Sequence, residues 1–208
     1  MASRGDRTRE HLLDVAEQLL GSEGVGKVSM RQIRIAAGQR NESAVQYHFG
    51  DIGGVIRALV ERHMPEVQAI QERIVAANGT RPSLRRQVDA MARPLVEYST
   101  RGASERAWTR ILADLISDPT LAFTTLQEGS PPLAARTGMA VYERLCEKLP
   151  PAVAGERVWA VTQFSIHVAA DRARLIDDPN ARRPPSPDDQ FVDNVVAMVY
   201  GALTAPPS

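Results

Sequence analysis

The amino-acid sequence predicts an all-α protein of about nine helices, with a small three-helix unit over residues 1–50 and a larger helical body over residues 51–208. Two observations predict this class. Apolar residues recur at spacings of three and four along most of the chain, which is the period of an amphipathic helix. Glycines, prolines and helix-capping residues separate these segments, whereas no segment has the alternating pattern of a strand.

The composition is that of a folded protein without a global charge. Hydrophobic residues make up 43% of the chain and charged residues 24%, which argues against disorder. The formal net charge is zero, and basic and acidic residues nearly balance within residues 1–50. Binding to a polyanion would therefore require that the two signs lie on different faces of the folded unit.

The first expected helix spans residues 8–20 and has one broad apolar side. Glycines at positions 21, 24 and 26 interrupt the pattern and end this helix. Its apolar side consists of Leu12, Val15, Ala16, Leu19 and Leu20.

Two short helices follow, joined by a turn that contains glycine. Ser29 and Gln32 have the spacing of a capping box at the start of the first, and Gly38 ends it. Asn41 is expected to cap the second, in which Val45 and Phe49 share the apolar side. Two such helices around a glycine turn are typical of a helix-turn-helix unit.

The N-terminal segments, taken in order, resemble the DNA-binding domain of the TetR family of transcriptional regulators. The resemblance rests on TREHLLDVAEQLLGSEG, then SMRQIRIAAG, then AVQYHFGD leading into a long helix, and it covers about the first quarter of the chain. The chain departs from the family at the start of the fourth helix, where the family commonly has a lysine and this chain has DIGGV.

The resemblance implies a DNA-binding domain over residues 1–50 and an effector-binding and dimerisation domain over residues 51–208. It implies a ligand-released repressor that binds a palindromic operator as a homodimer. Gln46 suits a paired contact to adenine, and Arg40 suits guanine or phosphate. The expected DNA-contacting residues are Ser29, Arg40, Asn41, Ser43, Gln46, Tyr47 and His48.

The body is expected to be helical from Asp51 to the C-terminus. Asp51, Ser83 and Ser104 are candidate N-caps, and Ser186-Pro187 opens the last helix. The middle helices carry apolar residues that either line an effector pocket or form ordinary core. These candidates are Met91, Trp108, Leu112, Phe123, Met139 and Tyr142.

The last two expected helices are apolar on more than one side. Residues 194–208 contain no charged residue, so this helix must be covered both by its own chain and by something else, or be buried in a monomeric core. The resemblance implies that these helices form a four-helix interface between two copies. Its candidate residues are Trp159, Ile166, Val195, Met198 and Val199.

The sequence contains no motif typical of an enzyme. It has no glycine-rich phosphate loop, no nucleophile elbow and no paired Cys or His at metal-binding spacing, so we expect no catalytic residue, metal or cofactor. His63 and His167 are either ligand donors in a cavity or hydrogen-bonded structural residues. The main alternative to a regulator is a helical small-molecule-binding protein that has lost DNA binding, and an enzyme on an all-helical scaffold is a second.

Cys146 is the only cysteine, which excludes an intrachain disulfide and favours a reducing compartment. The first residues lack the apolar stretch of a signal peptide, and no segment is long and apolar enough to span a bilayer. We therefore expect a cytoplasmic protein whose partners are a double-stranded DNA operator, a second copy of the chain and an apolar small molecule, with no membrane contact.

Overall fold

The structure, a computed structural model, describes residues 4–41, 43–117 and 132–206. Within these residues the chain forms nine α-helices and one short 3-10 helix, and it forms no strand. The predicted all-α class is therefore confirmed. No helix in the described ranges combines the length and the apolar character needed to cross a membrane.

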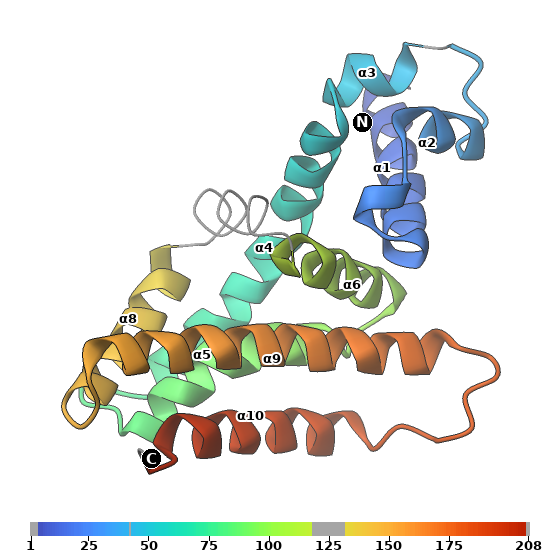
Figure 1. The fold of residues 1–208 in the computed structure, drawn as a ribbon. Helices are drawn as coiled ribbons and strands as arrows, with labels where there is room; N and C mark the ends of the chain where they lie inside the picture. The colour runs from blue at the N-terminus through green and yellow to red at the C-terminus, as the bar shows by residue number, and fades with distance from the viewer. Residues whose placement is uncertain (1–3, 42, 118–131, 207–208) are drawn as a thin grey trace.

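The N-terminal helices form a compact unit, called the head below, at one end of the molecule (Figure 1). The head comprises α1 (Arg4–Glu23), the 3-10 helix η1 (Val25–Lys27), α2 (Met30–Ala36) and α3 (Ala44–Phe49). Apolar residues of α1, α2 and α3 pack together in the same core cluster as residues of α4.

Local capping chemistry sets the bounds of the short helices. The capping box of Ser29 and Gln32 is confirmed, and Gly38 makes the turn after α2 with a φ of 64°. The prediction that Asn41 caps α3 is wrong, because Ser43 occupies the N-cap position. The Asn41 side chain instead accepts a hydrogen bond from the Ser43 N–H at 3.0 Å, which shapes the turn before the helix.

The body consists of longer helices that cross below the head in Figure 1. The two longest are α4 and α9, with 26 and 27 residues. These helices are α4 (Ile52–Ala77), α5 (Leu84–Tyr98), α6 (Ala103–Ser117), α8 (Pro132–Cys146), α9 (Pro151–Asp177) and α10 (Asp188–Thr204).

Two of the four predicted caps in the body are confirmed, and the prediction for Ser186 is wrong because Pro187 occupies the N-cap position of α10. Asp51 accepts from the Gly54 N–H at 2.8 Å, and Ser83 caps α5. The prediction for Ser104 is wrong, since α6 begins one residue earlier and the Ser104 hydroxyl donates to Glu17 of α1 instead. The side chain was expected to stabilise its own helix, but it links two helices.

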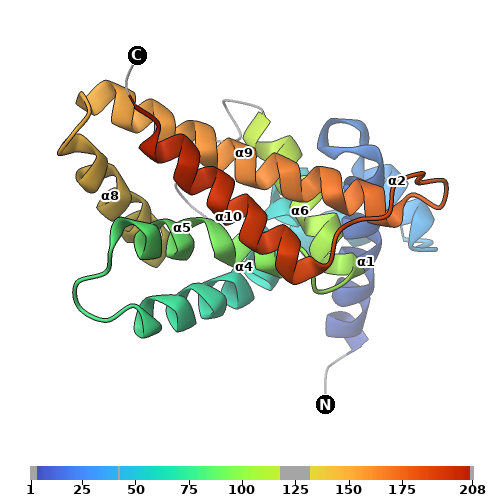
Figure 2. The ribbon, with the colours of Figure 1, turned by 90° about the horizontal axis from the view of Figure 1, so that it is seen from below.

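The body helices pack in two apolar clusters. In both views α9 and α10 lie side by side (Figures 1 and 2), and α10 also packs against α5. The first cluster joins the head to α4, α6 and α9, and the second joins α5, α8, α9 and α10. Because α6 packs against both α1 and α9, it is the element that lies between the head and the rest of the body.

The contact between α1 and α6 depends on a glycine. The Gly21 carbonyl accepts from Arg110 Nε at 2.8 Å, and a Cβ at Gly21 would lie 2.9 Å from the Ala107 Cβ. Only a residue without a side chain allows the two backbones to approach this closely.

We therefore predict that Gly21→Ala destabilises the fold by about 1–3 kcal/mol, because the added methyl group forces α1 away from α6. Urea unfolding measures the change. Gly26→Ala is the matched control, since a Cβ at Gly26 meets no atom within 4 Å. Equal stabilities of the two variants would contradict the close packing.

Candidate nucleic-acid interface and effector cavity

The short helix α3 exposes the residues that the sequence predicts to contact DNA. Gln46 and Tyr47 lie on the solvent side, and Tyr47 is 84% exposed. Val45 and Phe49 are buried behind them against the rest of the head. The side chains of Gln46 and Tyr47 are therefore free to contact a partner, which makes α3 a candidate contact surface.

Several contacts hold α3 and its turn in place. His11 of α1 lies 3.2 Å from the Ala37 carbonyl at the end of α2, through its Nε2. Arg34 donates to the Gln39 carbonyl at 2.9 Å, which closes the turn. The Arg9 guanidinium lies over the Phe49 ring, 5.2 Å from its centroid. The helix-turn-helix is therefore anchored to α1 on both sides of the turn.

The acidic residues of the head are concentrated in α1. On the side of α1 toward the body, Glu10, Asp14 and Glu17 all pair with Arg62 of α4, at 2.7, 2.8 and 2.9 Å. Burial lowers the pKa of Arg62, but these carboxylates raise it more, so the guanidinium remains charged. Residues 24–50 contain a single acidic residue, Glu42, and carry the basic residues Lys27, Arg31, Arg34 and Arg40.

The remaining predicted DNA contacts lie around the same surface. Arg40, Asn41 and Ser43 are exposed in the turn before α3, and His48 is half-buried. Ser29 is exposed at the start of α2, but its N–H and its hydroxyl both donate to the Gln32 side chain, at 2.8 and 2.7 Å. Both donors of Ser29 are thus already used within α2.

A cavity of about 400 Å³ lies in the body between α4, α5, α6, α8 and α9. Its wall is mainly apolar, with the polar side chains of Gln68, Gln71 and Thr162 among the lining residues. Trp108 also lines it, and its buried Nε1 has no hydrogen-bond partner in the part of the chain that the structure describes. An apolar cavity with a few polar groups is the usual form of a small-molecule site.

The cavity brings together half of the residues proposed for the pocket. Met91, Trp108 and Leu112 line it. Met139 and Tyr142 do not, because α8 presents Ala134, Ala135 and Gly138 to the cavity. Met139 is 53% exposed on the outside, and Tyr142 packs against the second core cluster. Phe123 lies outside the described residues.

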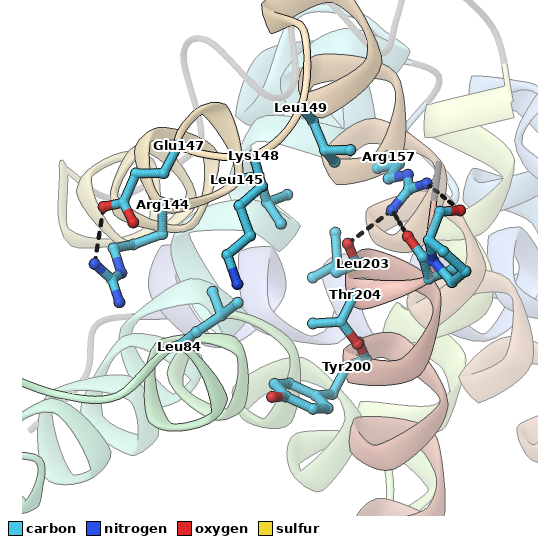
Figure 3. A pocket seen from close by; sticks show the side chains of 12 residues that line it. Leu84, Arg144, Leu145, Glu147, Lys148, Leu149, Arg157, Tyr200, Leu203 and Thr204 are labelled. Carbon is cyan, nitrogen blue, oxygen red and sulfur yellow. Dashed lines mark hydrogen bonds and ion pairs between the residues drawn. The ribbon is translucent and has the colours of Figure 1, made fainter. Parts of the chain in front are cut away.

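A second pocket, of about 480 Å³, lies where the ends of α8 and α10 meet α9 (Figure 3). The Lys148 ammonium group points into it, above Leu84. Arg157 donates to the carbonyls of Leu203 at 3.0 Å and Ala205 at 2.6 Å. Arg157 therefore caps the C-terminal end of α10, which is a structural role.

The residues proposed for the dimer interface separate into two groups. Met198 is 42% exposed and remains available to a partner, whereas Trp159 is 49% exposed but lines the cavity. Val195 and Val199 are completely buried in the second core cluster, because this side of α10 packs against α5 of the same chain. Ile166 is 5% exposed and lines the cavity, so these three residues do not lie on the surface of the chain.

A buried polar cluster was not predicted as a unit. Glu17 of α1 contacts Arg62 and His63 of α4 and Ser104 of α6, and His63 contacts Tyr98 of α5. The sequence does contain a signal, since Glu17 lies on the apolar side of α1 beside Leu20 and Leu13. His63 is a buried hydrogen-bonded residue, the second of the two interpretations left open for it.

Ionised Glu17 is favoured by its neighbours. Burial raises the pKa of Glu17, but contacts with His63, Ser104 and Arg62 lower it more, so the pKa lies below its ordinary value. No group of His, Cys, Asp and Glu side chains in the described ranges is arranged to hold a metal ion.

Similarity to known proteins lies in the fold and not in the sequence. No protein-family model and no curated protein matches the chain. Salmonella enterica GusR has a TM-score of 0.50 and 17% identity, with 98% of each chain covered. The transcriptional regulatory protein RHA5900 has a TM-score of 0.55 and 18% identity, covering 95% of this chain and 100% of that one.

A third similar structure is that of a protein assigned to a named family. A protein of Mesorhizobium loti MAFF303099, assigned to the TetR family of transcriptional regulators, has a TM-score of 0.52 and 14% identity. The match covers 97% of this chain and 98% of that one. Similarity over nearly whole chains confirms the resemblance inferred from the N-terminal residues at the level of the fold.

The low pKa of Glu17 predicts an acid-dependent contribution to stability. Because the pKa is lower in the folded chain, ionised Glu17 contributes stability above its unfolded pKa of about 4.3. This contribution is lost as the pH falls through the folded pKa. We expect the stability difference between wild type and Glu17→Gln to shrink as the pH falls below about 4.3. Urea unfolding as a function of pH measures it, and a constant difference down to about pH 3 would contradict it.

Proposed function

Because the chain has the fold of TetR-family transcriptional regulators, we propose that it is a DNA-binding regulator. It acts as a homodimer that represses by occupying a palindromic operator, and it leaves the operator when an apolar small molecule enters the cavity. The observation that carries this proposal is α3, a short helix that exposes Gln46 and Tyr47 while Val45 and Phe49 anchor it from behind.

The chemistry of the α3 surface supports double-stranded DNA as the partner. Gln46 suits a bidentate contact to adenine in the major groove, and Arg40 suits guanine or a phosphate. Tyr47 and His48 suit contacts to the backbone, which position the helix without reading sequence. Arg62 partly offsets the acidic charge of Glu10, Asp14 and Glu17, and the segment of the helix-turn-helix carries more basic than acidic residues, which favours binding to phosphates.

The outer side of α9 and α10 supports a homodimer. Phe164 and Met198 are 39% and 42% exposed, and the exposed positions of α10 after Asp193 carry no charge. The two helices run antiparallel, since Arg172 meets Asp188 at one end and Arg157 meets Leu203 at the other. This order places Phe164 and Met198 at similar levels, and a second copy would cover both.

The cavity supports an apolar effector. Its lining is mainly hydrophobic, and the Trp108 side chain forms part of the wall. The side chains of Gln71 and Thr162 already donate to the carbonyls of Ala90 and Val158, at 3.1 and 2.8 Å, so they are less available to a ligand.

Operator binding tests the function directly. Purified chain should retard fragments of its own promoter region in a gel, and footprinting should show two half-sites related by dyad symmetry. Gln46→Ala should relax base preference at one position per half-site, at a cost of about 1–3 kcal/mol. Tyr47→Ala should weaken binding to all sequences, because it removes a contact to the backbone.

A control separates loss of contact from loss of fold. Gln68→Ala changes the same residue type on the cavity side of the body, so it should leave base preference unaltered. Thermal unfolding of all three variants should match the wild type. Full operator affinity in the Gln46→Ala, Tyr47→Ala double variant would exclude α3 as the reading helix, and no retardation would favour the small-molecule-binding alternative.

Dimerisation through the outer side of α9 and α10 predicts that Met198→Arg gives a monomer, because it buries an unpaired charge in the interface. Sedimentation velocity measures the state. Gln190→Arg is the matched control at an exposed position near the start of α10 and should leave the dimer intact. Val199→Arg is unsuitable because it would disrupt the chain's own core. An unaltered, folded Met198→Arg dimer would exclude this interface.

A further inference from the structure

A single buried carboxylate connects the head to two helices of the body. Glu17 of α1 is 3% exposed. Its Oε1 accepts from the Ser104 hydroxyl of α6 at 2.5 Å, and its Oε2 accepts from Arg62 of α4 at 2.9 Å. His63 Nε2 of α4 lies 3.4 Å from Oε1. Since a buried carboxylate is costly without such partners, these contacts tie α1 to one arrangement of α4 and α6.

His63 connects this carboxylate to the wall of the cavity. Its Nδ1 lies 2.6 Å from the Tyr98 hydroxyl of α5, and its ring stacks on the Trp108 indole with centroids 5.1 Å apart and planes 5° apart. Trp108 in turn lines the cavity. The side chains of His63, Tyr98 and Trp108 are all at most 2% exposed. A continuous series of buried contacts therefore runs from the cavity to α1.

Helix α6 contacts α1 and the cavity with different faces. Arg110 donates to the Gly21 carbonyl, and Asp114 accepts from the Val25 N–H at 3.1 Å, so this face holds the end of α1. The other face places Trp108 and Leu112 in the cavity wall. Protein interiors are densely packed, so neighbouring groups must move when an indole is displaced. A displacement of Trp108 therefore also displaces His63, on which it stacks, and α6, to which it belongs.

We infer that Glu17, His63 and Tyr98 are positioning residues that couple occupation of the cavity to the orientation of the head. An occupant that moves Trp108 displaces His63 and α6 relative to each other, and Glu17 then cannot keep all its donors without a change in the orientation of α1. This inference rests on the proposed function, because it names the residues through which an effector would alter DNA binding.

A large side chain introduced by mutation can fill the cavity in place of a ligand. Gly138 lines the cavity, and a Cβ there meets no atom within 4 Å, so Gly138→Trp places an indole inside it. Glu17→Gln and Tyr98→Phe remove a charge and a hydroxyl from the cluster with little change in shape. Glu147→Gln is the matched control, since it removes an exposed carboxylate that pairs with Arg144 at the end of α8, away from the cluster.

The first measurement is operator affinity in a double-mutant cycle. Gly138→Trp should weaken operator binding by about 5- to 150-fold in the wild-type and Glu147→Gln backgrounds. In the Glu17→Gln and Tyr98→Phe backgrounds the same change should weaken it by at most about 2-fold, because the connection is broken. Equal effects in all four backgrounds, or no effect of Gly138→Trp in the wild type, would overturn the inference.

The second measurement needs neither DNA nor a folded Gly138→Trp variant. The neutral apolar dye N-phenyl-1-naphthylamine serves as the occupant, and its fluorescence reports binding. Amide hydrogen exchange in α1–α3 should change when the dye binds to wild type and Glu147→Gln, and should not change in Glu17→Gln. The same exchange response in Glu17→Gln, or none in wild type, would overturn the inference. Failure of wild type to bind any operator would overturn the proposed function alone.

Discussion

The position of the head depends on the ionised carboxylate of Glu17. In water a glutamate needs no protein partner, but at 3% exposure it must replace its hydration with donors from the chain. Ser104 and Arg62 supply these donors from α6 and α4, 87 and 45 positions away in the sequence. The geometry of one acidic group thus restricts how three helices meet, and α2 and α3 are carried in place by α1.

The same junction also pairs other acidic residues of the head. Arg62 contacts three carboxylates of α1, and its charge remains because those carboxylates raise its pKa more than burial lowers it. Acidic residues of α1 thereby become part of the junction with the body. The segment of the helix-turn-helix, residues 24–50, contains four basic residues, Lys27, Arg31, Arg34 and Arg40, and one acidic residue, Glu42.

The last helix illustrates why composition alone did not identify an interface. The apolar residues of α10 surround most of the helix, so the sequence predicts that two sides are covered without saying which residues belong to which side. In the folded chain Val195 and Val199 pack against α5, and Met198 remains exposed between them in the sequence. Which side packs on the chain itself is decided by the direction in which α5 approaches.

The sequence by itself determined the helical class, the helix-turn-helix and several helix ends, although α1 (Arg4–Glu23) continues through Gly21, where the sequence predicts its end. Ser29 with Gln32, Asp51 and Ser83 act on backbone groups within one turn, so a few neighbouring residues are enough to predict them. Tertiary structure decided where Ser104 donates, which half of the pocket residues meet, and that Glu17 and His63 form one cluster. These outcomes depend on helices that are distant in the chain, whose approach no local pattern specifies.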